Sequence, residues 1–303
     1  MKFTLDIPVG VITPGEFQSF EAVRAMATAL ETAGVDAAYV TDHPAPSSEW
    51  LHANGHDALD PFTALSFVAA STTTLRLHTN ILVMAYRNPF LTAKAAASLH
   101  TLSGGRLILG VGAGYQKVEF EALGVDFHKR GALFDEALDV VRQAWAGGAI
   151  VWQGRNFNAT GNEPRPALSS PPPIWIGGGS GKALERAARA GDGWCPFFAA
   201  PTMTAANQES GIHSVEQLGE NIVQLNEMRA AANRSGPFDI CIGARKRLKF
   251  GDGDSAATYV DAIGEMAQVG VTWTMVEPRH SSRQEYIDNV QWFGENVIAK
   301  LRG

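Results

Sequence analysis

The sequence contains little cysteine, since Cys195 and Cys241 are the only two among its 303 residues. They lie far apart and form no Cys-x-x-Cys pair, which excludes a disulfide framework and a thiolate zinc site. A long apolar run is also absent, because no stretch of about 18 apolar residues is available to cross a membrane. The first ten residues, MKFTLDIPVG, lack the apolar core of a secretory signal. We therefore expect a soluble protein of the reducing cytoplasm.

Positive charge is scarce as well. The chain has 25 lysines and arginines against 31 aspartates and glutamates, a formal net charge of -6. Proteins that bind the phosphate backbone of nucleic acids need a basic face, so nucleic acid is not an expected partner. Apolar residues make up 45% of the chain and charged residues 18%, a composition that predicts a packed globular core.

Several catalytic motifs are missing. No Gly-x-Gly-x-x-Gly follows the first predicted strand, and no Gly-x-Ser-x-Gly elbow is present, so a dinucleotide-binding sheet and a serine hydrolase lack support. The run GGGSGKA departs from the P-loop pattern at Ile176, where glycine is required, and at Ala183, where a hydroxyl is required. The eight histidines provide no His-x3-His pair on a helix, so no metal site is predicted.

What the chain does contain is a regular alternation of short strand-like runs with longer segments of helical period. This alternation is typical of βαβ units and a parallel sheet. The predicted strands cover residues 3–10, 36–43, 76–83, 106–114, 174–176, 193–198, 238–250 and 271–277. Eight such units predict an α/β fold, a (β/α)8 TIM barrel, and the alternative is a doubly wound sheet. We predict one domain over residues 1–303 with insertions after strands 4, 5 and 6, and insertion segments near 44–60, 150–172 and 199–213.

The candidate site residues lie at predicted strand ends, because the active face of such a barrel is formed by the carboxyl ends of the strands and the loops after them. Four strand ends carry candidates: Asp42 and His43 after the second, Thr79, Asn80 and Ile81 in the third, Gly112, Gly114 and Tyr115 after the fourth, and Gly177, Gly178, Gly179 and Ser180 after the fifth.

Each candidate has a functional and a structural interpretation. The glycine turn at 177–180 could hold a phosphate on its free N–H groups and the following helix N-terminus, or it could simply be a tight turn that needs positive φ. Histidine is the side chain best suited to proton transfer near neutral pH, so His43 could donate a proton, or it could be a bystander in a loop. Gly112 and Gly114 would let a flat ring approach the backbone, or would serve packing at the barrel rim.

Longer motifs resemble the luciferase-like monooxygenase superfamily, the flavin- or deazaflavin-dependent (β/α)8 oxidoreductases of bacteria. The matching segments are YVTDHP (39–44), NILVMAYRNPF (80–90), LSGGRLILGVGAGYQKVEFEALGVDF (102–127) and PPIWIGGGSGKALERAARAGDGW (172–194). They cover most of residues 1–200, whereas the last third of the chain matches only loosely. Within the superfamily the sequence is most similar to the coenzyme F420-dependent branch.

The resemblance implies a cofactor that lies across the carboxyl-terminal mouth of the barrel. Its phosphate would bind the turn at Gly177, Gly178, Gly179 and Ser180, and its ring would lie against the third strand at Thr79, Asn80 and Ile81, near Gly112 and Gly114. Members of the superfamily often have a non-prolyl cis peptide there, which predicts a cis Asn80-Ile81 bond. Asp42 and His43 would lie near the ring, and a homodimer and a small organic substrate are implied as well.

The reaction implied for coenzyme F420 is hydride transfer to or from the substrate, with His43 as the candidate proton donor. Related sugar-phosphate dehydrogenases carry a catalytic glutamate where this chain has Tyr115, which argues against glucose 6-phosphate and leaves Tyr115 as a candidate phenolic donor. An FMN-dependent monooxygenase and a non-catalytic flavin-binding protein remain alternatives. A lyase or hydrolase without a redox cofactor would need carboxylates such as Asp42 and Glu277 at strand ends.

Overall fold

The computed structural model describes residues 1–11, 13, 15–53, 55–201, 203 and 205–302. The strands of its barrel are β1 (Lys2–Asp6), β2 (Ala37–Val40), β3 (Arg76–Thr79), β4 (Leu82–Val83), β5 (Leu107–Gly112), β8 (Ile174–Gly177), β9 (Gly193–Cys195), β10 (Asp239–Ile240) and β11 (Trp273–Val276). All pair in parallel in the order β10-β9-β8-β5-β3-β2-β1-β11, with β4 beside β5. A parallel bridge between Cys241 and Trp273 brings the two ends of this order together. The predicted (β/α)8 barrel is confirmed.

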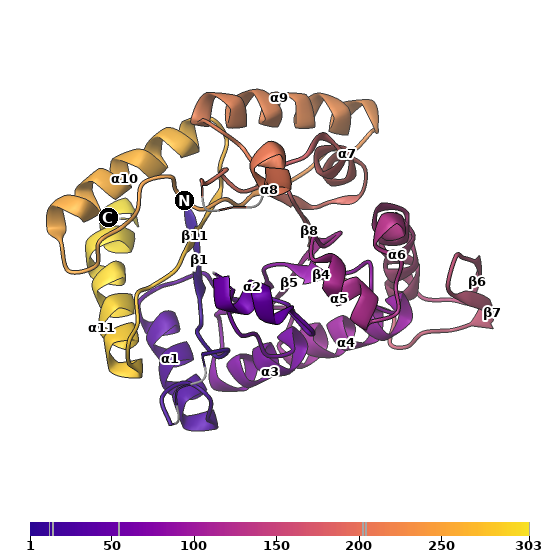
Figure 1. The fold of residues 1–303 in the computed structure, drawn as a ribbon, viewed down its shortest axis with the longest axis horizontal. Coiled ribbons are helices and arrows are strands. Elements are labelled where there is room, and N and C mark those ends of the chain that lie inside the picture. Colours follow the sequence, from indigo (N-terminus) through magenta and orange to yellow (C-terminus); the bar gives the residue numbers. More distant parts are fainter. Residues whose placement is uncertain (12, 14, 54, 202, 204, 303) are drawn as a thin grey trace.

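Helices surround the barrel and connect successive strands (Figure 1). The helices are α1 (Phe20–Thr32), α3 (Pro61–Ser71), α4 (Pro89–Leu102), α6 (Arg130–Ala146), α7 (Gly181–Ala190), α9 (Val215–Ala231), α10 (Gly253–Gln268) and α11 (Arg283–Phe293). Their start signals are local: Asp60 caps α3 and Asn88 caps α4, and in each a proline occupies the first position, where no N–H is needed. None of the described helices is both long and apolar enough to span a membrane.

The barrel wall separates two apolar cores. Along each strand, alternate side chains point outward against the helices or inward into the barrel. The inner core consists of Ala37, Ile108, Trp175, Cys195, Cys241 and Trp273. Trp175 and Trp273 meet edge to face with ring centroids 5.2 Å apart. Side chains therefore fill the barrel interior below the carboxyl ends of the strands, and a ligand can enter only from the mouth. Both cysteines are free and buried in this core.

Additional short helices cover the mouth. These are α2 (Ser48–Ala53) after the second barrel strand, α5 (Lys117–Ala122) after the fourth, and α8 (Ala205–Ser210) after the sixth. Figure 1 shows all three on the side of the barrel that faces the viewer. The segments near 44–60 and 199–213 therefore lie at the mouth, as expected of loops that follow strand ends.

One expectation about insertions needs correction. The structure has no insertion after the fifth barrel strand, because β8 and β9 are joined by α7 and short turns, and the additional segments follow the second, fourth and sixth strands. The segment 150–172 contains a hairpin, β6 (Ile150–Gln153) with β7 (Asn158–Asn162), and it does not shield the mouth. Trp152 donates to Glu136 of α6 at 3.2 Å, and Figure 1 shows the hairpin on the outside of this helix.

Candidate functional site

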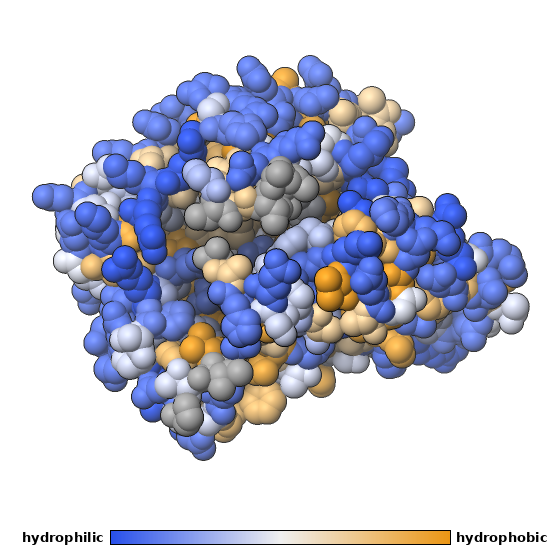
Figure 2. All heavy atoms as spheres, viewed as in Figure 1, coloured by the Kyte–Doolittle hydropathy of each residue, from blue (hydrophilic) through white to orange (hydrophobic). Residues whose placement is uncertain are grey.

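Two neighbouring cavities open at the carboxyl-terminal mouth of the barrel. The first has a volume of 390 Å³ and the second 560 Å³, and both are lined by Tyr39, Arg247, Glu277 and Arg279. These volumes are in the range of small-molecule sites. Figure 2 shows the same face of the molecule hollowed near its centre and surrounded by polar side chains.

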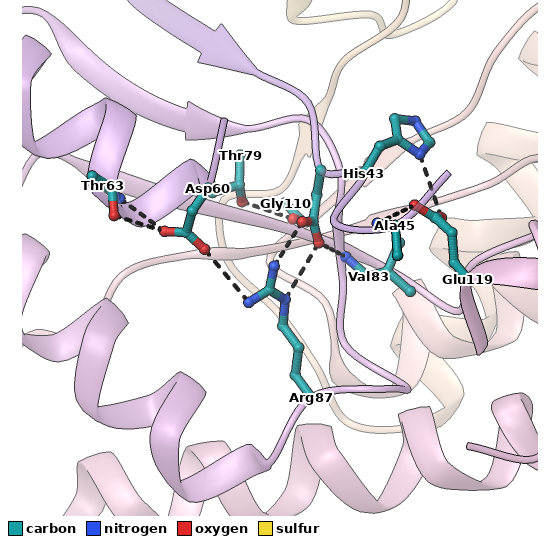
Figure 3. A network of polar contacts seen from close by, with 10 residues as sticks. His43, Ala45, Asp60, Thr63, Thr79, Val83, Arg87, Gly110 and Glu119 are labelled. Atoms are coloured by element: carbon teal, nitrogen blue, oxygen red, sulfur yellow. Dashed lines mark hydrogen bonds and ion pairs between the residues drawn. The ribbon is translucent and has the colours of Figure 1, made fainter. Parts of the chain in front are cut away.

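Asp42 lies directly behind this mouth and is almost fully buried. Its carboxylate accepts hydrogen bonds from the Val83 backbone N–H at 2.9 Å and from the Arg87 guanidinium at 2.6 and 3.3 Å. Burial raises the pKa of Asp42, and the positive charge of Arg87 opposes that rise. Figure 3 shows Arg87 reaching from its loop toward Asp60, whose carboxylate lies 3.7 Å from the guanidinium. Both carboxylate oxygens of Asp42 therefore accept hydrogen bonds that join two loops. The structure does not support a direct contact between Asp42 and a ligand.

His43, the next residue, is held by one ring nitrogen. Its Nδ1 lies 3.4 Å from the Glu119 carboxylate, to which it donates when it carries a proton, and 3.0 Å from the Gln116 amide nitrogen, from which it accepts when it does not. Glu119 is buried in α5 and also accepts the Ala45 N–H at 3.4 Å (Figure 3). Gln116 is the N-cap of α5 but makes no side-chain cap bond, so its amide is free to reach the imidazole. Contacts at Nδ1 orient the ring and leave Nε2 as the nitrogen that can face a ligand.

Aromatic rings enclose His43 on its other sides. Ring centroids of Trp50 and His56 lie 4.5 and 5.1 Å away, and that of Tyr115 lies 6.1 Å away. Trp50 belongs to α2, and His56 donates or accepts at the Thr41 hydroxyl at 2.9 Å. His52 and His56 are four residues apart, but only His52 belongs to α2, and no group of described residues forms a metal site. The structure therefore brings His43 and Tyr115 together.

The third barrel strand is interrupted at its end, where β3 stops and β4 begins. The Asn80-Ile81 peptide between them is cis, as predicted. Asn80 lines the second cavity, and its amide donates to the Met275 sulfur at 3.0 Å. Thr79, by contrast, is fully buried and its hydroxyl donates to the Gly110 carbonyl at 2.8 Å. The side chain of Thr79 therefore joins β3 to β5 and does not reach a ligand.

Ile81 explains two of the predicted glycines. A Cβ on Gly112 would lie 3.0 Å from the Ile81 side chain, and one on Gly177 would lie 2.9 Å from it. Both glycines therefore make room for Ile81, not directly for a cofactor. Gly114 has φ +81°, and a Cβ there would meet Val83 at 2.6 Å, so this glycine is required for local packing.

The glycine turn after β8 is a tight strand-to-helix connection that leads into α7. Gly178 has φ +111°, a conformation that L side chains rarely adopt, and its N–H donates to the Cys195 carbonyl at 3.0 Å. Ser180 caps α7, where its hydroxyl accepts the Ala183 N–H at 3.3 Å. A Cβ on Gly179 would clash with the Ser210 carbonyl, so α8 passes directly beside the turn. The first N–H groups of α7 have no partner within the helix and can bind a phosphate.

A third group of polar residues lies on the opposite side of the mouth. The Tyr39 hydroxyl donates to the Glu277 carboxylate at 3.4 Å, and Asp6 lies on the neighbouring strand β1. Burial, and then repulsion from Glu277, raises the pKa of Asp6 from 3.8 to about 7. Burial and the two nearby carboxylates also raise the pKa of Tyr39. The pair of carboxyl groups therefore retains a proton close to neutral pH.

This pKa makes the stability of the protein depend on pH. Between pH 4 and 7 the folded state keeps a proton on Asp6 that the unfolded chain has released, so folding stability falls as the pH rises through 7. The shift from 3.8 to about 7 corresponds to at most about 4 kcal/mol, and because Asp6 is only half-buried we expect about half of that. Asp6→Asn is expected to match the parent near pH 4 and to be more stable by about 2 kcal/mol at pH 8.

Urea unfolding at both pH values tests this expectation. The control is Asp57→Asn, which removes an exposed carboxylate that lines the same first cavity. A gain that is equal at pH 4 and pH 8 would contradict the assignment of the titration to Asp6.

Comparison with known proteins agrees with this geometry. A family model described as luciferase-like monooxygenase matches residues 2–245. The chain belongs to this family. An uncharacterised protein of Mycobacterium tuberculosis H37Rv is 31% identical over 82% of this chain and 80% of its own length. The F420-dependent glucose-6-phosphate dehydrogenase of Kineococcus radiotolerans is 34% identical over 60% of this chain and 52% of its own.

Solved structures show the same fold for this luciferase-like chain. A monooxygenase from Streptomyces bottropensis superposes with a TM-score of 0.77 at 21% sequence identity, covering 99% of this chain and 100% of that one. Other relatives and solved structures include coenzyme F420-dependent enzymes, and a riboflavin lyase with modified FMN superposes with a TM-score of 0.75 at 16% sequence identity, covering 100% of this chain and 91% of that one. The family model confirms the family predicted from the sequence, and the superposed structure confirms the fold. Members of this family are oxidoreductases or monooxygenases.

Some residues of the luciferase-like site were missed by sequence reasoning. Glu119 and Gln116 stand in an ordinary amphipathic stretch, and nothing in QKVEFEA marks either as a partner of a histidine 70 residues earlier. Arg87 lies within a quoted motif, but its pairing with Asp42 depends on a loop conformation. Asp6 falls inside the apolar strand predicted over residues 3–10. Its position at the carboxyl end of β1 was the only signal that could have marked it as a site residue.

Proposed function

We propose that the protein is an oxidoreductase that uses coenzyme F420 for hydride transfer to or from a small organic substrate. The observation that carries this proposal is His43, which is held at Nδ1 by Glu119 and Gln116 with Nε2 left for a ligand. The F420-dependent relatives support the choice of cofactor. When bound, coenzyme F420 supplies the hydride donor or acceptor.

The residues of the chain would divide the work as follows. The backbone N–H groups of Gly179 and of the first residues of α7, which follow Ser180, would bind the cofactor phosphate, and Gly178 would shape the turn that presents them. Asn80 would position the ring beside β3. His43 would give a proton to the substrate oxygen, or take one from it, at Nε2, and Glu119 would stabilise the protonated imidazole. Tyr115 and Trp50 would help to exclude water from this position.

Titration of the purified protein with coenzyme F420 and, separately, with FMN tests the proposal, with ring fluorescence as the signal. We expect F420 to bind at least tenfold more tightly, a difference of about 1.4 kcal/mol. Preference for FMN would favour the alternative, an FMN-dependent monooxygenase. Binding of neither would overturn the cofactor assignment. F420 binding without turnover of any alcohol or ketone in a panel would favour a non-catalytic binding protein.

A pair of glycine variants locates the phosphate. Gly178→Ala is expected to weaken F420 binding at least tenfold, because Gly178 has φ +111° in the turn. Gly161→Ala is the control, since Gly161 also has positive φ, +100°, but lies in the outer hairpin with open space around it. Equal F420 affinity of the two variants would remove the turn from the site.

The homodimer and the cytoplasmic location stay predictions. Size-exclusion chromatography with light scattering tests the prediction of a homodimer.

A further inference from the structure

The second cavity has a charge that contrasts with the rest of the protein. Four cationic residues, Arg245, Lys246, Arg247 and Arg279, line it, and Glu277 is the one acidic residue among its lining. The chain as a whole carries a net charge of -6. Positive charge is therefore concentrated at this position of the mouth, in the part of the chain that follows β10 and β11.

These cations are not used to hold the fold together. The ion pairs formed within the described part of the chain include none of the four. By comparison, Arg87, Arg142, Arg186 and Arg234 each pair with an aspartate elsewhere in the molecule. Arginines that line a cavity without a carboxylate partner can offer their planar donor forks to a carboxylate or phosphate.

The remaining lining of this cavity is largely apolar. Phe197, Phe198 and Phe250 are half-buried in its wall, and Leu248 is buried there. The Arg245 guanidinium lies 5.6 Å from the Phe198 ring centroid, so the charged and aromatic parts of the lining are contiguous. A volume of 560 Å³ accommodates more than a free inorganic ion.

The cavity also borders the interrupted third strand, because Asn80 is part of its lining. Asn80 precedes the cis peptide, and Ile81 lies over Gly112 and Gly177. Neither His43 nor the glycine turn at 177–180 lines the first or the second cavity. A ligand in the second cavity would therefore lie beside the position proposed for the cofactor ring and would leave the phosphate turn free.

We propose that the second cavity binds the non-reacting part of the substrate and that this substrate is an organic anion, with its carboxylate or phosphate held by Arg247 and Arg279, its apolar part against Phe197, Phe198 and Phe250, and its reacting end extending past Asn80 out of the cavity toward His43. The assignment as substrate rests on the proposed function, whereas the binding of the anion does not. Arg247 and Arg279 are chosen because they line both cavities and so stand at the boundary between them.

Isothermal titration calorimetry with three probes tests this inference on the full 303-residue chain: phenyl phosphate, benzyl alcohol and inorganic phosphate. Phenyl phosphate is expected to bind at least tenfold more tightly than either of the others, because only it carries both the anion and the ring. Arg247→Gln and Arg279→Gln are each expected to weaken phenyl phosphate binding about tenfold and to leave benzyl alcohol binding unchanged. Arg155→Gln, which removes an exposed charge on the outer hairpin, is the control and should bind as the parent does.

The outcomes separate this inference from the proposed function. Equal affinity for phenyl phosphate and benzyl alcohol, or equal effects of Arg279→Gln and Arg155→Gln, would overturn the anion site even if F420 binds. Displacement of phenyl phosphate by F420 with one-to-one stoichiometry would show that the cavity belongs to the cofactor and would overturn the substrate assignment. Simultaneous binding of F420 and phenyl phosphate supports it. Phenyl phosphate binding in a protein that binds no flavin would support the anion site and overturn only the redox function.

Discussion

Arg87→Ala is expected to lower the free energy of unfolding by about 3–5 kcal/mol, because it leaves a buried carboxylate without its cation. The Asp42 side chain is only 2% exposed, and the Arg87 Nη2 lies 2.6 Å from its Oδ1. Without Arg87 the Val83 N–H remains as a partner, and one hydrogen bond does not offset the desolvation of a full charge. Because Asp42 and Arg87 join the loop after β2 to the loop after β4, the variant also loosens the segment that carries His43.

Urea unfolding at pH 7 measures this loss, and Arg165→Ala is the matched control. Arg165 pairs with Glu163, but the two side chains are 76% and 45% exposed, so its removal should cost less than about 1 kcal/mol. Adding Asp42→Asn to Arg87→Ala is expected to recover part of the loss, since it removes the unpaired charge. The loss should also shrink at lower pH, where Asp42 becomes protonated. Similar losses for Arg87→Ala and Arg165→Ala would show that the pair contributes little.

His43→Ala is expected to lower kcat by about 10²- to 10⁴-fold, the usual contribution of a positioned proton donor. The dissociation constant of coenzyme F420 should change little, because the phosphate turn after β8 is separate from His43. Glu119→Gln is expected to have a smaller effect on kcat, because Glu119 orients the imidazole through Nδ1 and does not itself transfer the proton. The measurement is F420 fluorescence during turnover of the best substrate in the alcohol and ketone panel.

The control for this prediction is His128→Ala, which removes an exposed histidine from the short turn before α6. It should leave kcat and the pH profile unchanged. A His43→Ala variant with the parent's kcat would show that another group moves the proton. The Asp6 and Glu277 pair would then be the first alternative, because it retains a proton near neutral pH.

The sequence predicted elements well where local signals were strong. Helix starts have such signals, because Asp60-Pro61 opens α3 and Asn88-Pro89 opens α4, each with a capping side chain followed by proline. The sequence predicted strand ends less well. The seventh predicted strand covers residues 238–250, whereas β10 covers only Asp239–Ile240. Residues 243–248 leave the sheet and line the second cavity, and no local pattern distinguishes such residues from a strand that continues.

By itself the sequence determined the eight β/α units, the family and the strand ends at which the site lies, because periodicity and motifs are properties of neighbouring residues. The tertiary structure alone decided the partners: Glu119 and Gln116 for His43, Arg87 for Asp42, Ile81 for Gly112 and Gly177, and the cationic wall of the second cavity. Those contacts join residues that are tens of positions apart. They arise only when the closed barrel brings the ends of its parallel strands to one mouth, and only the arrangement of the loops there selects which side chains meet.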